Sequence, residues 1–184
     1  MINVYLKYTA MVILDLLSGV VNLILAPIIV MFADKDGWLP RWLWWFQTPG
    51  DSLFGSIGWQ TEDAWFIPQD TMWKVWLNRI GWLYRNSMYG FAISVLGVQS
   101  KEGDEVIMTG DPATNNHKKT FHPGTIRYTL YRDGQPIAFQ IYIIKPLIFG
   151  RYFRGNFGWK LWDFPTPLPM QFTFSPNPFR TIPK

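Results

Sequence analysis

The chain has 184 residues, of which 48% are hydrophobic, 18% aromatic and only 16% charged. Soluble domains carry roughly a quarter of charged residues, and the apolar excess found here excludes a disordered polar chain. The absence of cysteine excludes a disulfide scaffold, a thiolate zinc site, an iron–sulfur cluster and a cysteine nucleophile. The length suits one domain, or a small domain with an appendage.

The net charge of +4 is unevenly distributed along the sequence. Up to Asp111 there are 7 basic and 11 acidic residues, a balance of −4. From Pro112 onward 10 basic residues stand against Asp133 and Asp163, a balance of +8. A basic half can meet nucleic acid, anionic lipid or an acidic protein, or can be a solvated surface, and charge alone does not choose among these.

Residues 11–33 form a 23-residue apolar stretch whose only charge is Asp15. At about 1.5 Å per residue, a helix of this length crosses a hydrocarbon core of about 30 Å. The single lysine before it and the poor cleavage site after it do not resemble a cleaved signal peptide. The stretch predicts a long helix, kinked near Pro27, that is membrane-embedded, buried in a protein assembly or part of an ordinary core.

Small and polar residues of this segment fall on one helical stripe, because they are spaced i, i+3, i+4, i+7 and i+11. In lipid such a stripe turns toward protein, since a carboxylate facing hydrocarbon is unfavourable. We therefore expect a helix-packing face that docks on another copy or another protein. In an ordinary core helix the same face would contact only its own chain. The face consists of Asp15, Ser18, Gly19, Asn22 and Ala26.

Nine of the eleven tryptophans lie between residues 38 and 82. Glycine and proline interrupt residues 34–69 often enough to predict an ordered loop region there. Tryptophan concentrates at membrane interfaces, so this region is a candidate aromatic belt. An aromatic core and stacking on sugar rings are the alternatives. The candidate interfacial residues are Trp38, Trp42, Trp44 and Trp45.

A short amphipathic helix is expected over residues 71–86, with Asp70 as its N-cap. Apolar residues recur there at i, i+3, i+4, i+7 and i+10 from Trp73, which is the helical period. The other positions carry basic residues, a pattern typical of helices on anionic membranes and also of helices on a domain surface. Packing against a core is the favoured interpretation.

Several stretches resemble recurring blocks of an uncharacterised family of small tailed-bacteriophage proteins. They are GWLPRWLWWFQTPGDSLFGSIGW at residues 37–59, NRIGWLYRNSMYGFA at 78–92, GWKLWDFP at 158–165 and FTFSPNPFR at 172–180. The resemblance covers most of the chain. It implies no catalytic residue, because that family has no assigned activity, but it does imply a phage gene product in the virion or in the infected cell.

The C-terminal region predicts an antiparallel sheet built around a hairpin. Asp133-Gly134, the dipeptide favoured by type I′ turns, separates two β-rich runs at 125–132 and 135–145. Pairing across a two-residue turn sets Leu130 opposite Ile137 and Tyr128 opposite Phe139. This register predicts one buried apolar face and one mostly polar face.

Further strands are expected near residues 105–109, 147–154, 157–162 and 170–174, while the proline-rich end from residue 175 should be irregular or extended. The predicted architecture is α+β: a long apolar helix, a Trp-rich loop region with a short amphipathic helix, and an antiparallel β meander. Three segments are expected: an apolar helix at 1–33, a Trp-rich collar at 34–69 and a small α+β domain at 70–184.

The sequence contains no P-loop, dinucleotide fingerprint or nucleophile elbow, so it assigns no catalytic residue, cofactor or metal. His117 and His122 with nearby carboxylates could form a hard metal site, although solvated turns are the favoured interpretation. A nucleic-acid surface, also not favoured, would combine phosphate-neutralising residues with aromatic rings. Its basic members would be Arg127, Arg151, Arg154 and Lys160.

We therefore expect a non-enzymatic bacteriophage structural or accessory protein, attached through its N-terminal helix to the host inner membrane and assembled as an oligomer. The alternative is a virion component whose helix packs among copies or against other phage proteins. A soluble nucleic-acid-binding protein or metal-dependent enzyme is the alternative of another class.

Overall fold

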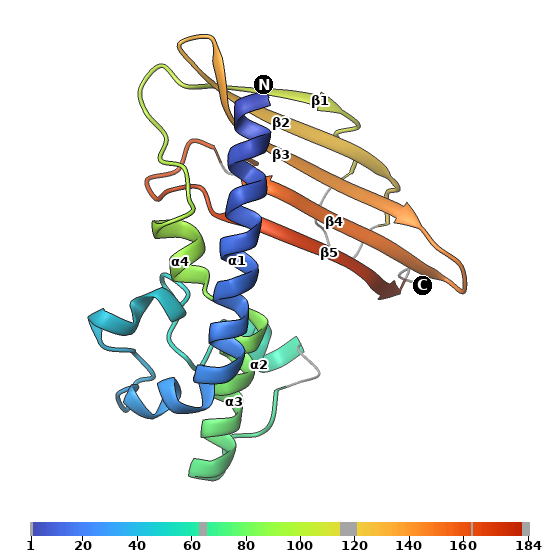
Figure 1. Cartoon of the computed structure of the whole chain (residues 1–184). Coiled ribbons are helices and arrows are strands. Elements are labelled where there is room, and N and C mark those ends of the chain that lie inside the picture. The colour runs from blue at the N-terminus through green and yellow to red at the C-terminus, as the bar shows by residue number, and fades with distance from the viewer. Residues whose placement is uncertain (1, 63–65, 115–120, 163, 182–184) are drawn as a thin grey trace. The chain divides into compact units, whose positions relative to one another are not determined.

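The computed structural model describes residues 2–62, 66–114, 121–162 and 164–181 (Figure 1). It is an α+β protein with a long N-terminal helix, short middle helices and a C-terminal five-stranded antiparallel sheet. The helices are α1 (Ile2–Ile29), α2 (Ile57–Glu62), α3 (Met72–Arg85) and α4 (Tyr89–Ser94), with 3-10 turns η1 (Val30–Phe32) and η2 (Arg41–Phe46). The strands are β1 (Glu105–Gly110), β2 (Gly124–Arg132), β3 (Gln135–Pro146), β4 (Arg151–Trp159) and β5 (Phe172–Thr181).

Internal contacts divide the chain into two compact units. The first unit comprises Met1–Val12 and Leu96–Lys184, so it holds the first turns of α1 together with the sheet. The second unit, Ile13–Val95, holds the rest of α1 and the middle helices. Because α1 contributes to both, this division does not follow the three consecutive segments expected from the sequence.

The amphipathic helix α3 begins at Met72, one residue later than expected. Thr71 has the extended backbone of an N-cap, and its side chain accepts a hydrogen bond from the Lys74 backbone N–H at 3.3 Å. Asp70 instead receives the Lys74 ammonium at 2.8 Å. The capping position therefore falls on Thr71, and Asp70 forms an i, i+4 ion pair beside it.

The sheet is a simple meander in which β1 to β5 lie side by side in chain order (Figure 1). β4 joins into one strand the two segments expected at residues 147–154 and 157–162. β5 continues through Pro176 and Pro178 to Thr181, so the proline-rich end is extended and paired. An edge strand tolerates proline, because a missing N–H on its open side leaves no ladder bond unmade.

The predicted hairpin forms, but the predicted register is wrong beyond the turn. Arg132 pairs with Gln135 as expected, and a β-bulge then sets Leu130 opposite Ala138 instead of Ile137. Pro136, just past the turn, cannot donate to the ladder, and a bulge accommodates such a residue. Every later pair is shifted by one, which places Phe139 on the opposite face from Leu130.

Both faces of the central strand β3 are therefore covered, whereas the predicted register gave the hairpin one buried face and one polar face. On one face the rings of Tyr5 and Tyr8 from α1 lie 4.8 and 5.0 Å from the Phe139 ring. On the other face the buried Tyr142 ring lies 5.8 Å from Trp162, which follows β4. The chain after β4 thus folds back over the sheet.

A buried amide holds that returning segment. Gln140 is completely buried, and its Oε1 accepts the backbone N–H groups of Leu161 and Trp162 at 2.8 and 3.3 Å. Its Nε2 donates to Asn156 Oδ1 at 2.9 Å. The buried Leu161 N–H and the Asn156 side-chain carbonyl would lose these partners without this side chain.

Gln140→Leu should therefore lower the free energy of unfolding by about 1–3 kcal/mol, because it leaves a buried N–H and a buried carbonyl without partners. Urea denaturation measures the change. Gln135→Leu, at an exposed turn position, is the matched control and should change stability by less than about 0.5 kcal/mol. Equal effects of the two substitutions would contradict this role for Gln140.

A bidentate ion pair ties the hairpin to the loop before β1. The Arg132 Nε and Nη2 atoms donate to the two carboxylate oxygens of Asp104, each at 2.7 Å. Arg132 Nη2 also donates to the Gln99 carbonyl at 2.9 Å. The Arg132 hydrogen bond holds the pKa of Asp104 below its usual value.

This pair predicts a pH-dependent contribution to stability. Because the folded-state pKa of Asp104 is lowered, the contribution is complete above pH about 4 and disappears as the pH falls through the folded pKa. Asp104→Asn should lower the melting temperature at pH 7, and the difference from wild type should shrink as the pH falls below about 4. A difference that stayed constant from pH 7 to pH 2 would show that protonation of Asp104 is not involved.

Candidate functional site

The outward side of α1 is apolar without interruption. Every exposed residue from Ile13 to Phe32 is hydrophobic, and at 100° per residue these positions cover an arc of roughly 200°. We call this set the outward arc. It consists of Ile13, Leu14, Leu16, Leu17, Val20, Val21, Leu23, Ile24, Leu25, Ile28, Met31 and Phe32.

The predicted helix-packing face of α1 points the other way. Ser18, Asn22 and Ala26 are buried, and Asp15 and Gly19 are half-buried. Asn22 Nδ2 donates to the Leu83 carbonyl of α3 at 2.9 Å, which satisfies one of the free carbonyls in the last turn of that helix. The neighbour of this face in the structure is thus α3 of the same chain.

Pro27 adds a second connection between these helices. Proline has no N–H to donate to the carbonyl four residues earlier, which is that of Leu23. The Tyr84 hydroxyl of α3 donates to the Leu23 carbonyl at 3.1 Å, and Trp76 Nε1 donates to the Pro27 carbonyl at 3.2 Å. α1 therefore continues through the proline to Ile29, because α3 supplies the missing donor.

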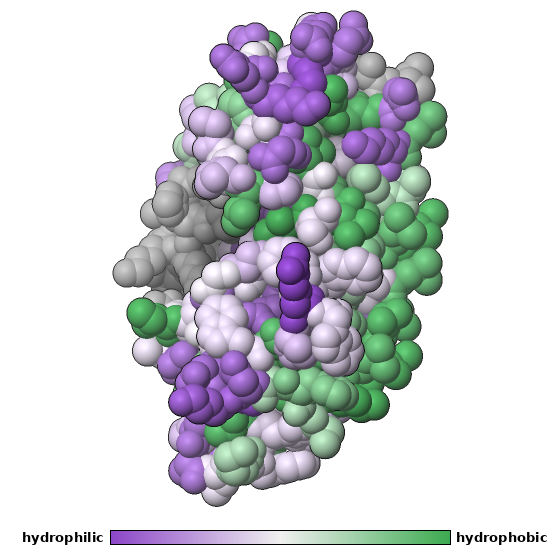
Figure 2. All heavy atoms as spheres, turned by 90° about the vertical axis from the view of Figure 1, so that its left-hand side faces the viewer, coloured by the Kyte–Doolittle hydropathy of each residue, from purple (hydrophilic) through white to green (hydrophobic). Residues whose placement is uncertain are grey.

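This arrangement reverses the usual pattern of a surface helix, which turns its polar side to water. Within the described residues, Asn3–Phe32 is the helical stretch long and apolar enough to cross a membrane by length and composition. Figure 2 shows hydrophobic residues gathered along its right-hand edge. An exposed apolar area of this kind marks a contact with lipid or with protein.

α3, which is hydrogen-bonded to α1, carries basic side chains. Arg79 Nη2 donates to the Asp34 carbonyl at 3.0 Å, and its guanidinium lies 4.8 Å from the Phe54 ring centre. Burial lowers the pKa of Arg79 from its usual value. Arg85 lies 5.5 Å from the Trp82 ring. α3 thus carries Arg79 and Arg85 on the same helix that is hydrogen-bonded to α1.

The tryptophans divide into two groups. Trp59 and Trp82 are almost completely buried and form part of the core of the second unit. The four candidate interfacial residues, Trp38, Trp42, Trp44 and Trp45, are all exposed, Trp42 to 68%. The aromatic-core interpretation describes Trp59 and Trp82, whereas the membrane-interface belt remains a prediction for the four exposed tryptophans.

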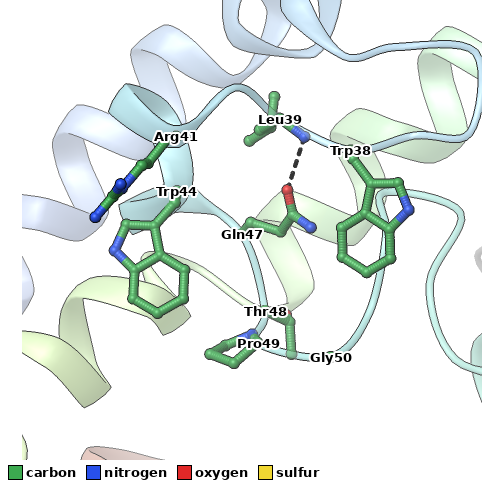
Figure 3. Close-up of a pocket in the computed structure, with 8 residues that line it drawn as sticks. All are labelled: Trp38, Leu39, Arg41, Trp44, Gln47, Thr48, Pro49 and Gly50. Carbon is green, nitrogen blue, oxygen red and sulfur yellow. Dashed lines mark hydrogen bonds between the residues drawn. The ribbon is translucent and has the colours of Figure 1, made fainter.

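An open cleft of about 640 Å³ lies among the exposed tryptophans. Figure 3 shows Trp38 and Trp44 on opposite sides of Gln47, whose Oε1 accepts the Leu39 N–H at 2.8 Å. The Thr48 hydroxyl is buried and has no hydrogen-bond partner among the described residues. The cleft is lined by Trp38, Leu39, Arg41, Trp44, Gln47, Thr48, Pro49 and Gly50.

Gly90 of α4 keeps this segment in place. A Cβ atom at Gly90 would lie 2.3 Å from the Trp44 carbonyl oxygen and 2.9 Å from that of Gln47. A side chain cannot fit at that distance, so only glycine allows α4 to approach η2 this closely. The sequence contained no pattern that identified this requirement.

The predicted basic residues of the sheet region do not form one surface. Arg127 donates to the Tyr5 hydroxyl on the face covered by α1, whereas Arg154 lies 5.8 Å from the Tyr142 ring on the other face. Arg151 lies at one end of the sheet, and Lys160 follows β4. A nucleic-acid-binding surface built from these four residues would need them on one face of the sheet, and Arg127 and Arg154 lie on opposite faces.

The carboxylates considered for a metal site have other partners. Asp104 is paired with Arg132, and Asp111 Oδ1 accepts the Ala113 N–H at 2.9 Å. His117 lies outside the described residues. Within the described part of the chain, no group of three histidine, aspartate or glutamate side chains could hold a metal ion.

The hydrogen bond from Tyr84 can be tested by a double-mutant cycle. Tyr84→Phe should lower the free energy of unfolding by about 1 kcal/mol, because the Leu23 carbonyl loses its donor. In a Pro27→Ala background residue 27 regains its N–H and can satisfy that carbonyl, so Tyr84→Phe should have a smaller effect. Equal effects in both backgrounds, measured by urea denaturation, would contradict the compensation.

Comparison with known proteins gives one result. No curated protein and no solved structure matches the chain significantly. A family model described as a family of unknown function, DUF7338, matches residues 1–184. Since the match covers the whole sequence, the chain belongs to the DUF7338 family of unknown function.

Proposed function

We propose that this protein is a non-enzymatic membrane-attached protein, held on a lipid bilayer by the outward arc of α1. The uninterrupted apolar character of that arc is the observation that carries the proposal. Water is an unfavourable neighbour for twelve adjacent aliphatic and aromatic side chains, whereas the acyl region of a bilayer is a favourable one.

The position of the polar residues of α1 supports lipid as the surroundings of the outward arc. In membrane helices the polar and small residues turn toward protein, where backbone and side-chain partners are found. Asn22 and Ser18 of α1 do so here, with Asn22 bonded to the α3 backbone. A helix on the surface of a water-soluble domain would carry such residues on its outer side.

Attachment in the plane of the membrane fits the structure better than a complete crossing. A crossing of α1 would carry α3, which is hydrogen-bonded to it, toward the hydrocarbon together with the cations Arg79 and Arg85. Each would be disfavoured by roughly 2.5–3.5 kcal/mol at the centre of a helix in the membrane. With α1 lying at the interface, the outward arc enters one leaflet and α3 stays on the water side.

The exposed tryptophans fit the same placement. Trp42 lies 5.4 Å from Phe32, the last residue of the outward arc. Indole rings favour the headgroup level, where the ring is in an apolar layer and the N–H remains hydrated. The belt would therefore lie at the interface next to the embedded helix.

The resemblance to small tailed-bacteriophage proteins supports the biological setting within this proposal. A phage product with a lipid-binding face would attach to the inner membrane of the infected cell as an accessory protein. The second candidate is a virion component in which the outward arc packs against copies of the chain or other phage proteins. The same apolar exposure supports it, because an assembly also buries such a face.

Ile24→Glu places a charge in the middle of the outward arc and tests the proposal. Introduction of a carboxylate should reduce binding to phosphatidylcholine vesicles about tenfold or more, measured by flotation. Ile57→Glu is the matched control, since Ile57 is exposed to 81% but lies on α2, away from the arc, whereas Ile24 is exposed to 65%. It should bind like the wild type.

Two results would reject lipid attachment by this face. One is unchanged vesicle binding by Ile24→Glu. The other is a wild-type protein that does not float with vesicles and sediments, without detergent, as an oligomer that Ile24→Glu dissociates. This second result would support the assembly candidate.

A further inference from the structure

The turn between β3 and β4 presents three apolar side chains at one end of the sheet. Leu147, Ile148 and Phe149 are all exposed, Phe149 to 89%. The turn is short and closed by backbone hydrogen bonds, from Leu147 N to the Arg151 carbonyl at 2.7 Å and from Arg151 N to the Ile148 carbonyl at 3.3 Å. Its side chains are therefore held outward by an ordered backbone.

The backbone of this turn does not favour phenylalanine. Phe149 and Gly150 have φ values of +57° and +65°, as in a type I′ turn. The β2–β3 turn of the same sheet has the same form, with Asp133 and Gly134 at +49° and +70°. Aspartate tolerates the left-handed region, whereas a bulky aromatic residue there is an outlier that suggests a function. Turn geometry alone thus accounts for Asp133 but not for Phe149.

Cations surround this end of the sheet. β5 ends beside the turn, because Arg151 pairs with Thr181, and it adds the exposed Phe179 and the basic Arg180 (Figure 1). Lys145 precedes the turn and is exposed, as is Arg151 after it. The sequence has no acidic residue from Gly134 to Trp162 and none after Asp163. The apolar tip is thus flanked by basic residues only.

We infer that this tip is a second lipid-contact site, specific for membranes with anionic phospholipids. Phe149 and its two apolar neighbours enter the acyl boundary, while Lys145, Arg151 and Arg180 contact headgroup phosphates. Each basic residue near an anionic surface strengthens binding about fivefold. A convex, three-residue tip offers little area for a stable protein interface, which buries about 800 Å² on each partner, but it is sufficient to insert into lipid.

The inference goes beyond the function proposed above, because it concerns the other unit of the chain and a different chemistry. The outward arc has no charged residue and should bind zwitterionic and anionic membranes alike. The tip should bind anionic membranes and should release them at high salt, since surface charge is screened. Lipid composition therefore separates the two contacts experimentally.

The test uses the full chain, and the absence of native cysteine allows single-site labelling. An environment-sensitive fluorophore on Phe149→Cys should brighten and shift to the blue with phosphatidylglycerol-containing vesicles but not with pure phosphatidylcholine. The same label on Asp133→Cys, in the matching turn, should not respond to either. An equal response at both positions, or none at position 149, would overturn the inference.

Phe149→Asp gives the complementary measurement. Because aspartate suits this backbone, the variant should melt at or above the wild-type temperature, which excludes misfolding as a cause. Its affinity for anionic vesicles should fall at least tenfold, while its weaker binding to phosphatidylcholine stays unchanged. Phe149→Leu should retain most of the affinity.

The outcomes for the two sites are distinguishable. If Ile24→Glu abolishes binding to phosphatidylcholine while the label at position 149 still responds to anionic vesicles, both sites act independently. If wild type and Phe149→Asp bind anionic vesicles equally, the tip is not a lipid contact, whatever Ile24→Glu does. Failure of the wild type to bind anionic vesicles at all would also reject the tip.

Discussion

Hydrogen bonds between α1 and α3 decide which side of α1 faces outward. Asn22 donates to a free carbonyl at the end of α3, and Tyr84 donates to the carbonyl that Pro27 leaves without a partner. Both bonds would be lost if α1 were rotated about its axis, and the buried Asn22 amide N–H would then have no partner, which is strongly disfavoured. With this side of α1 held against α3, the aliphatic residues of the outward arc face away from α3. The most exposed apolar surface of the second unit is thus a consequence of satisfying a few polar groups.

The sheet of the first unit shows the same principle in another form. Tyr5 and Tyr8 of α1 cover one face, and the segment held by Gln140 covers the other. With both faces of β3 covered, the turns at its two ends remain exposed. One turn carries Asp133, and the other carries Phe149 in the same backbone conformation. The two turns share a backbone conformation and differ in the side chain they expose, which is the basis for the lipid contact that we infer at Phe149.

Sequence patterns predicted much of the fold correctly. Residues 105–109 and the Asp133-Gly134 hairpin appear as strands, and α3 follows the predicted apolar period. The errors arose where a single residue shifts a pattern. The bulge beside Pro136 changed the side-chain direction along the rest of the hairpin, and the capping role moved from Asp70 to Thr71. Residue propensity and the alternation of apolar and polar residues both assume a regular strand. Neither can therefore predict a bulge, which adds one residue to one of the two strands.

By itself the sequence determined the apolar helix, the stripe from Asp15 to Ala26, the meander and the presence of a tryptophan-rich segment, because each follows from local periodicity or composition. Only the tertiary structure decided what these features face. It placed α3 against the stripe, separated the buried Trp59 and Trp82 from the four exposed tryptophans, and dispersed Arg127 and Arg154 over two faces of the sheet. The physical reason is that burial and hydrogen bonding depend on partners distant in the chain. Periodicity shows that a helix has a distinct face, but the groups that pack against it show where that face points.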